Sequence, residues 1–155
     1  MIRNLNGFEG HFMIDGIKIK RITSHNDGRG YFREILRYDN RLLKRFGQVS
    51  ISLTKPSVIK AFHWHKKQDD LFYVVSGKAL VVLYDIRENS KTFGRIMSLE
   101  MNENEPKLLF IPKGVAHGYK VLGNKPLTML YIMDKSYNAK NPDEWIINFL
   151  KSELE

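Results

Sequence analysis

The sequence predicts an all-β fold, either an antiparallel sandwich or a barrel. Short runs rich in Val, Ile, Phe and Tyr recur along the chain and are separated by Gly, Pro, Asn or Asp, which is typical of short strands joined by turns. The run KALVVLYDIR (residues 78–87) is almost wholly apolar and predicts a strand that is buried on both faces or close to it. The run QVSISLT (residues 48–54) alternates and predicts a strand with one wet face. Regular spacing of such runs favours a sandwich or a barrel.

Two segments carry a helical pattern. Residues 39–46 begin with Asp39, a candidate N-cap, and are followed by Gly47, which predicts a short helix of two turns. In residues 142–154, Pro142 stands at a plausible first helical position. Apolar side chains then recur on one stripe, formed by Trp145, Ile146, Phe149 and Leu150. We therefore expect a C-terminal helix that packs on the barrel.

Length and composition favour one domain over residues 1–155. The chain has 155 residues, 43% of them hydrophobic, which fits a single domain with its own core. No apolar run approaches the roughly 18 residues of a membrane span, and the first residues lack the apolar stretch of a secretory signal. We expect a cytoplasmic protein without a membrane partner. The absence of cysteine excludes disulfides, thiolate metal ligands and a Cys nucleophile.

The charge balance favours anionic partners. The formal net charge is +8 and the sequence pI is about 9.6, which suits phosphorylated metabolites, nucleic acid or acidic membranes. The lysines are scattered, however, and no zinc-finger or ribonucleoprotein motif is present. Nucleic acid is therefore not an expected partner.

Two histidines stand together in an apolar run. His63 and His65 are two residues apart in a predicted strand, so they point to the same face. Two imidazoles on one face can share a metal ion or flank one substrate. Both possibilities remain open at this point.

The segments SVIKAFHWHKKQDDLFYVVSG (residues 57–77) and PKGVAHG (residues 112–118) resemble the two signature motifs of the cupin superfamily. The resemblance implies a double-stranded β-helix, or jelly-roll, barrel. It also implies that the metal-ligand positions of the superfamily are held here by His63, His65, Asp70 and His117. Three imidazoles and a carboxylate suit Fe, Mn, Ni or Zn and do not choose among them.

A second resemblance covers more of the chain. DGRGYFRE (27–34), VVSGKALVVLYDIRENSKTFGRIMSLEM (74–101) and LLFIPKGVAHGYKVL (108–122) are similar, in order and spacing, to the dTDP-4-dehydrorhamnose 3,5-epimerase family of cupins. This resemblance implies an epimerase or isomerase that acts on a nucleotide-linked, dTDP-type 4-keto-6-deoxy sugar in deoxysugar or polysaccharide biosynthesis. It implies no cofactor, a homodimer, and an N-terminal arm (about residues 1–35) that completes the partner's sheet or nucleotide site.

The same resemblance assigns roles to single residues. His63 matches the general base of the family, and Tyr131 matches the acid on the opposite face. Protons beside a keto group are acidified, so an imidazole can remove one while a phenol returns one from the other side. The positions implied to bind substrate are Arg29, Phe32, Glu34, Gln48, Lys60, His117 and Tyr137.

Two departures from the family leave alternatives open. Its lysine near the reacting centre falls on Asp70, and His65 stands where these epimerases usually carry Gln. The family's aspartate that holds the base comes from a longer C-terminal section, for which Asp134 and Asp143 are candidate replacements. As a hypothesis, a divalent metal replaces the lysine as the electrophile for a keto oxygen. The alternatives are a metal-dependent cupin enzyme on another small substrate and a non-catalytic cupin that binds sugar nucleotides.

Overall fold

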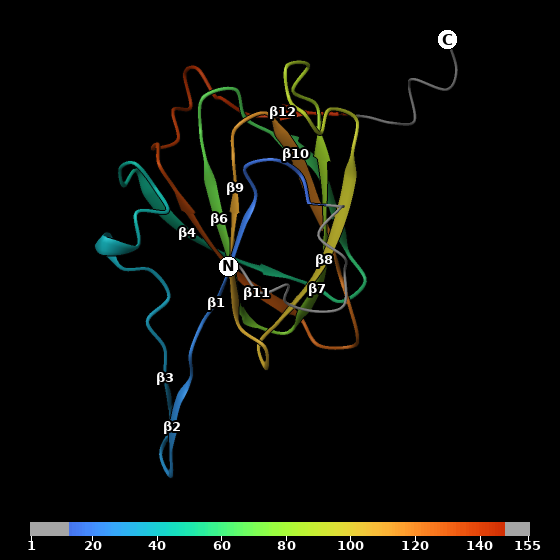
Figure 1. Ribbon diagram of the computed structural model, residues 1–155. Coiled ribbons are helices and arrows are strands. Elements are labelled where there is room, and N and C mark those ends of the chain that lie inside the picture. Colours follow the sequence, from blue (N-terminus) through green and yellow to red (C-terminus); the bar gives the residue numbers. More distant parts are fainter. Residues whose placement is uncertain (1–12, 148–155) are drawn as a thin grey trace.

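The computed structural model describes residues 13–147, and its main body consists of two facing five-stranded antiparallel sheets (Figure 1). The first sheet has the order β1 (Lys18–Arg21), β9 (Lys107–Ile111), β6 (Asp70–Ser76), β11 (Leu127–Met133) and β4 (Gln48–Thr54). The second has the order β12 (Trp145–Ile146), β5 (Ile59–Trp64), β10 (Val115–Val121), β7 (Lys78–Asp85) and β8 (Ile96–Asn102).

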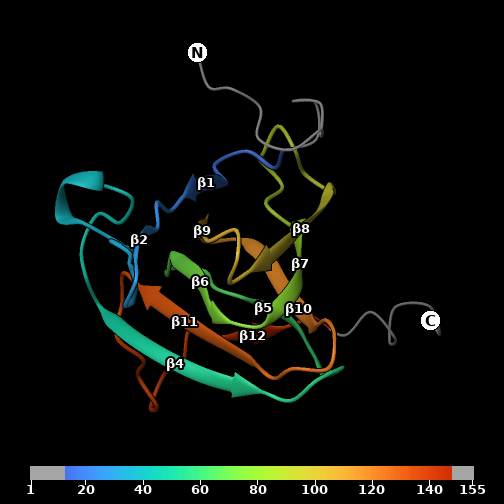
Figure 2. The same cartoon turned by 90° about the horizontal axis from the view of Figure 1, so that it is seen from below.

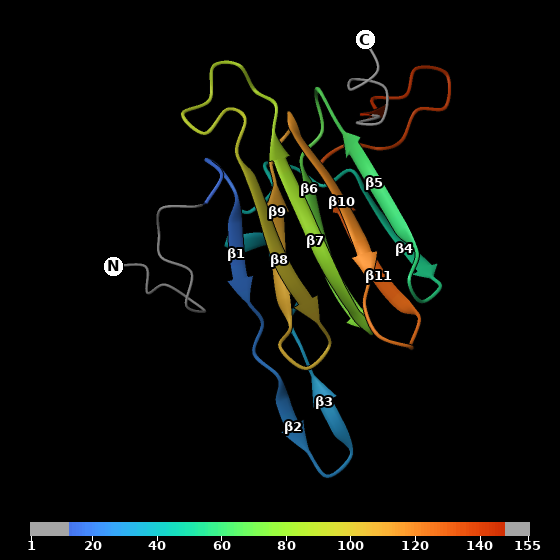
Figure 3. The same ribbon diagram turned by 90° about the vertical axis from the view of Figure 1, so that its right-hand side faces the viewer.

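Neighbouring strands come from distant parts of the chain. β6 lies between β9 and β11, and β10 lies between β5 and β7. Figure 3 looks onto the second sheet with the first sheet behind it, and Figure 2 shows the two sheets facing each other from below. Such long connections between antiparallel neighbours are those of a jelly roll. The all-β prediction is therefore confirmed.

The core lies between the sheets. On β7, Ala79, Val81 and Leu83 are fully buried and alternate with half-buried outer residues. They pack in one cluster with Phe72 and Val74 of β6. The strand is therefore fully buried on its inner face and only half-buried on its outer face, which nothing in the described chain covers completely.

The outer face of the first sheet carries a second apolar cluster. Leu71 and Tyr73 of β6 and Leu108 of β9 are buried there. The segment that follows the N-terminal hairpin covers them with Ile35, Leu36, Leu42 and Leu43. β6 is thus buried on both faces, which places its first residue, Asp70, at a position with little solvent access.

Strand β4 has the opposite arrangement from a core strand. Its polar residues face inward, whereas Val49, Ile51 and Leu53 face outward with 48%, 65% and 71% of their surface exposed. The predicted wet face exists, but it is the inner one, because this part of the barrel encloses a cavity in place of packed side chains.

The prediction of a two-turn helix over residues 39–46 is wrong. A single 3₁₀ turn covers Tyr38–Asn40, and Arg41 adopts a left-handed conformation (φ 49°) that ends it. Leu42 and Leu43 then pack on the first sheet. Contact with the sheet has outweighed a weak local preference for helix.

The expected C-terminal helix is also wrong over its described part, residues 142–147. Trp145 and Ile146 form β12, which pairs with Trp64 and His63 of β5. The free edge of β5 offers backbone hydrogen bonds that an isolated amphipathic helix would leave unused. Residues 148–154 of that prediction lie outside the described residues. Within residues 13–147, no helix is long and apolar enough to span a membrane.

The N-terminal arm contains a hairpin that projects from the barrel (Figures 1 and 3). It consists of β2 (His25–Asp27) and β3 (Gly30–Phe32), and every residue of both strands is exposed. β1, earlier in the arm, is the edge strand of the first sheet.

Candidate functional site

A cavity of about 770 Å³ is lined by residues of both sheets and by the segment that leads into β12. This volume is in the range of small-molecule sites. The structure brings eight of the eleven catalytic, substrate-binding or metal-ligand candidates to its wall, namely Gln48, Lys60, His63, His65, Asp70, His117, Tyr131 and Tyr137. Asp143 also belongs to the wall.

An irregularity in the pairing of β5 lets both Lys60 and His63 face the cavity. His63 pairs with His117, but Lys60 pairs with Tyr119, so β5 has one more residue than β10 in this interval. Such a bulge brings two residues three apart to the same face. The two strands approach each other closely here. A Cβ on Gly118 would lie only 2.5 Å from the Cβ of Ala61, so this position requires glycine.

A carboxylate lies next to His63. Oε1 of Glu144 is 2.8 Å from His63 Nδ1, although the contact lacks hydrogen-bond geometry. The two candidates named from the sequence have other contacts. Asp134 accepts the backbone N–H of Asp69 at 2.9 Å, and the Asp143 carboxylate accepts the backbone N–H groups of residues 66 and 67 at 3.0 and 2.7 Å.

Tyr131 belongs to a chain of hydroxyl groups. Its hydroxyl lies 3.1 Å from Ser52 Oγ and 2.9 Å from the hydroxyl of Tyr119, which in turn lies 3.0 Å from Thr54 Oγ1. The ring packs edge-on against Phe72. Burial raises the pKa of Tyr131 above that of a free phenol.

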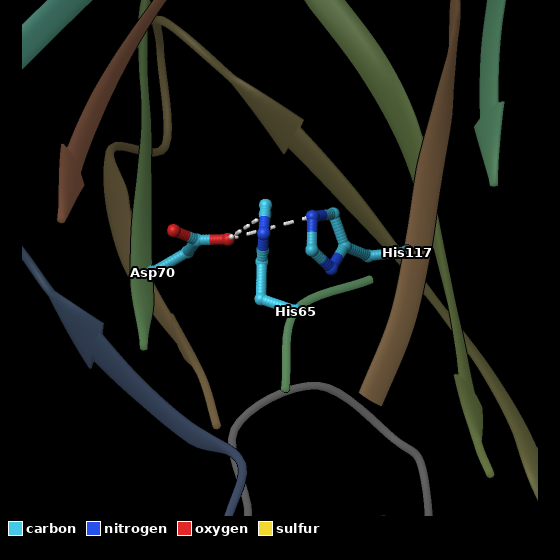
Figure 4. A group of neighbouring side chains, drawn as sticks. All are labelled: His65, Asp70 and His117. Carbon is cyan, nitrogen blue, oxygen red and sulfur yellow. Dashed lines mark ion pairs between the residues drawn. The ribbon is translucent and has the colours of Figure 1, made fainter. Parts of the chain in front are cut away.

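A second group of side chains gathers around Asp70 (Figure 4). Oδ2 of Asp70 lies 3.2 Å from His65 Nε2 and 3.5 Å from His117 Nε2. Gln68 Nε2 donates to the other carboxylate oxygen at 2.8 Å. The donor atoms of His65, Asp70 and His117 all lie within 4.8 Å of one another. His63, the fourth residue of the ligand set named from the sequence, is not in this cluster.

The two imidazoles of the cluster differ in basicity. Burial by itself would lower the pKa of His65, but the hydrogen bond and charge of Asp70, with the carbonyl and charge of Asp143, outweigh it and raise the pKa to about 9. Burial lowers the pKa of His117, and the attraction of Asp70 does not compensate.

Cations and aromatic rings line the outer part of the site. Lys60, Lys66, Lys67 and Lys135 belong to the cavity wall. Lys66 Nζ lies 4.0 Å from the centre of the Trp145 ring, which is 6.0 Å from the Trp64 ring. Four lysines in the wall of one cavity favour an anionic ligand.

Three residues of the expected site are not at this cavity. Arg29, Phe32 and Glu34 belong to the projecting arm, whose described residues contribute nothing to the wall of the cavity of their own chain. The Arg29 side chain is 91% exposed and, within residues 13–147, bonds to its neighbour Asp27 at 2.7 Å. Glu34 pairs with Arg37 at 3.1 Å.

Several cavity residues were not identified from the sequence. Ser52 stands four residues after Gln48, and Tyr119 two residues after His117, so the period of a strand could have placed both on the inner face. Glu144 carried no such signal, because its segment has a helical pattern.

Comparisons with known proteins agree with the fold and identify a family. A family model described as dTDP-4-dehydrorhamnose 3,5-epimerase matches residues 11–155. The spore coat polysaccharide biosynthesis protein SpsL of Bacillus subtilis is 56% identical over 132 residues, which are 85% of this chain and 87% of that protein. The dTDP-4-dehydrorhamnose 3,5-epimerase of Methanothermobacter thermautotrophicus is 31% identical over 72% of this chain, which spans 64% of that protein.

Solved structures give the same result. The epimerase RmlC of Legionella pneumophila, in complex with dTDP-4-keto-L-rhamnose, superimposes with a TM-score of 0.80 at 28% identity over 91% of this chain and 77% of that one. A dTDP sugar isomerase of Desulfovibrio desulfuricans has a TM-score of 0.81 at 26% identity over 87% of this chain and 85% of that one. The cupin-type barrel implied by the sequence motifs is thereby confirmed.

Proposed function

The chain belongs to the dTDP-4-dehydrorhamnose 3,5-epimerase family, and on this premise we propose that it epimerises a dTDP-linked 4-keto-6-deoxy sugar for polysaccharide biosynthesis. The epimerases of this family act without a cofactor. One observation carries the proposal: His63 of the second sheet and Tyr131 of the first sheet line the same cavity. A base and an acid on opposing walls are what inversion of a carbon centre requires.

Each inversion is a proton removal followed by a proton return on the other face. His63 takes the proton from the carbon beside the C4 carbonyl, and the electron pair of the broken C–H bond moves to O4 as an enolate. The enolate then takes the phenolic proton of Tyr131, and a new C–H bond forms on the opposite face. Solvent restores the proton of Tyr131 and removes that of His63, so the enzyme is unchanged.

The neighbours of these two residues support their roles. Glu144 at Nδ1 of His63 stabilises the imidazolium that forms after proton transfer. Ser52 and Tyr119 hold the Tyr131 hydroxyl in one place. Glu144 places a carboxylate beside the base, which supports an enzyme over a non-catalytic binding protein.

The nucleotide part of the substrate is assigned to the lysines of the cavity wall. The lysines of the cavity wall suit a diphosphate, which carries negative charge at neutral pH. Tyr137 is exposed, and its backbone N–H donates to Oε1 of Gln48 at 2.9 Å, which anchors it beside the opening. An exposed aromatic ring held in this way can stack on a base.

We also propose a homodimer. The outer face of β4 exposes Val49, Ile51 and Leu53 on an edge strand, whose backbone groups on one side have no strand partner among the described residues. Exposed apolar side chains on a free edge are typical of an interface. In a dimer, the projecting arm would carry Arg29 and Phe32 to the cavity of the other subunit. The absence of cysteine agrees with a cytoplasmic location.

Incorporation of solvent deuterium into dTDP-4-keto-6-deoxyglucose, followed by NMR, tests the function. Label at C3 and C5 supports a 3,5-epimerase, and label at C3 alone supports a mono-epimerase. A 3-keto product would identify an isomerase instead. Absence of exchange together with tight dTDP binding would overturn the proposal in favour of a binding protein. His63→Asn is the control variant, because any exchange that it still shows does not depend on the proposed base.

A further inference from the structure

The proposed reaction does not use the buried polar cluster around Asp70 (Figure 4). We propose that Asp70, His65 and Asp143 are positioning residues, which together hold Glu144 at His63. The effect of these residues on the rate rests on the proposed function, in which His63 is the base. Their effect on the position of Glu144 can be measured without a substrate.

Glu144 belongs to a segment with little regular structure. Between β11 and β12, residues 134–144 form no helix or strand. The turn within this segment is closed by its own residues, since the backbone N–H groups of Lys140 and Asn141 both donate to Asn138. β12 itself has only two residues, which pair with β5. So short a strand fixes little by itself, and Glu144 therefore needs further contacts to remain beside the base.

A continuous series of contacts joins this segment to the middle of the first sheet. Asp70 begins β6, which pairs with β9 on one side and with β11 on the other. Its Oδ1 accepts a hydrogen bond from Gln68 at 2.8 Å, and its Oδ2 lies 3.2 Å from Nε2 of His65. Nδ1 of the same ring contacts the backbone carbonyl of Asp143. The His65 ring thus links a buried strand to the residue that precedes Glu144.

The ring of His65 donates from both of its nitrogens. A carbonyl oxygen and an ionised carboxylate only accept hydrogen bonds, so Nδ1 and Nε2 each carry a hydrogen. The pKa of His65, raised to about 9, agrees with this imidazolium form. The side chains of His65 and Asp70 are 13% and 5% exposed, so little water competes for these contacts. Loss of either partner would leave a buried charge without its counter-charge.

The carboxylate of Asp143 provides a second attachment. Its two oxygens accept the backbone N–H groups of Lys66 and Lys67, at 3.0 and 2.7 Å. Hydrogen bonds to a charged acceptor are stronger than those between neutral groups. Since Lys66 directly follows His65, both attachments join the same two stretches of the chain. Asp143 is therefore fixed at its carbonyl and at its carboxylate, and the next residue, Glu144, is held in the cavity wall.

The two tryptophans of the chain report whether β12 is in place. Trp145 pairs with Trp64 of β5, with ring centres 6.0 Å apart, and the sequence contains no other tryptophan. Near-UV circular dichroism of the full-length chain measures the packing of this pair. Asp143→Ala should lose the signal of the pair. Asn102→Ala is the matched control and should keep it, because the Asn102 side chain also accepts two backbone N–H groups, at 2.9 and 2.8 Å, but does so outside the cavity.

Steady-state kinetics test whether Asp143 acts through Glu144. Asp143→Ala should lower kcat about tenfold, because the carboxylate beside the base is misplaced, while the Kd for dTDP stays within about twofold. In a Glu144→Gln background the same substitution should cause no further loss of kcat, since residues that act as a unit are not additive. Asp143→Asn keeps one acceptor oxygen and should recover part of the rate and of the tryptophan signal.

His65→Gln tests the other attachment, because one donor nitrogen takes the place of two. It should also weaken the tryptophan signal. If this variant fails to fold, Asp143→Ala still decides, since Asp143 is only half-buried. A wild-type tryptophan signal in Asp143→Ala, or the same loss of kcat with and without Glu144, would overturn the proposal. If the wild-type chain shows no deuterium exchange, the proposed function fails, and the tryptophan signal alone decides whether these residues hold the segment in place.

Discussion

The carboxylate of Glu144 lies 2.8 Å from Nδ1 of His63. Glu144 immediately precedes β12, and β12 pairs with β5 through Ile146 and His63. The short terminal strand therefore does more than cover an edge, because it carries a negative charge to the proposed base. The contact places a carboxylate beside the imidazole that is proposed to take a proton from the substrate.

Glu144→Gln should slow the reaction without loss of nucleotide binding. Loss of the charge leaves the imidazolium unstabilised, so we expect kcat to fall about tenfold to a hundredfold, while the Kd for dTDP stays within about twofold. Glu144→Asp should recover part of the rate. The measurements are steady-state kinetics with the 4-keto sugar and dTDP calorimetry.

Glu100→Gln is the matched control for this substitution, because Glu100 lies on β8 and pairs with Lys78 away from the cavity. It should have wild-type kinetics. A Glu144→Gln enzyme with wild-type kcat would show that the carboxylate has no part in positioning the base.

Tyr131→Phe should separate proton removal from inversion. The ring still packs against Phe72, but the hydroxyl that returns the proton is missing. We expect inversion to slow by about 10²- to 10⁴-fold, the usual contribution of a general acid. Exchange of deuterium on the face of His63 should continue, which NMR detects as label in unconverted substrate.

Tyr119→Phe provides the comparison for that variant. Tyr119 bonds the Tyr131 hydroxyl at 2.9 Å, so its loss should reduce the rate by about tenfold or less, the value of one neutral hydrogen bond. A larger loss of rate in Tyr119→Phe than in Tyr131→Phe would show that Tyr131 is not the acid.

The fold was predictable because alternation along strands is a local signal. The identity of the inner face was not. In QVSISLT the pattern is the same whichever side faces the core, and only the cavity explains why Gln48 and Ser52 point inward. The bulge that brings Lys60 and His63 to one side depends on pairing with β10, a partner far away in the sequence.

The C-terminal segment shows how a free sheet edge changes a local pattern. Trp145 and Ile146 fit an amphipathic helix, yet they pair with β5, and the Trp145 ring lies beside Trp64. That pairing is also what places Glu144 next to His63. A site residue that depends on a strand of two residues could not be recognised from periodicity.

Substitution of the two adjacent lysines of the cavity wall should weaken nucleotide binding. Lys66→Ala combined with Lys67→Ala removes two cations from the basic side of the cavity. We expect the Kd for dTDP to rise about tenfold, which corresponds to about 1.4 kcal/mol, with a smaller dependence on salt. Calorimetry at two ionic strengths measures both effects. The control of equal charge is the double variant Lys44→Ala and Lys91→Ala, because neither lysine belongs to the cavity wall. An equal rise of the Kd for dTDP in that variant would mean that binding depends only on net charge.

The connection between β7 and β8 should make stability depend on pH in acid. Asp85 is fully buried, and its carboxylate accepts hydrogen bonds from Arg87 Nε at 2.7 Å, Ser90 Oγ at 2.6 Å and Thr92 Oγ1 at 2.6 Å. Burial by itself would raise the pKa of Asp85, but these hydrogen bonds outweigh it and hold the pKa well below its usual value.

The lowered pKa of Asp85 sets the direction in which the free energy of unfolding changes with pH. A carboxyl group whose pKa is lower in the folded state stabilises the fold above its unfolded pKa of about 3.9, and this contribution is lost as pH falls through the folded pKa. We expect the free energy of unfolding, measured with urea, to decrease below about pH 4.

Asp85→Asn should be about 3 kcal/mol less stable at pH 7, because it leaves Arg87 without its charged partner. The variant should also lose less stability in acid than the wild type. Asp27→Asn, on the exposed hairpin, is the control, since its pairing with Arg29 lies in water and contributes little to the free energy of unfolding. Parallel acid profiles for wild type and Asp85→Asn would contradict this account of the turn.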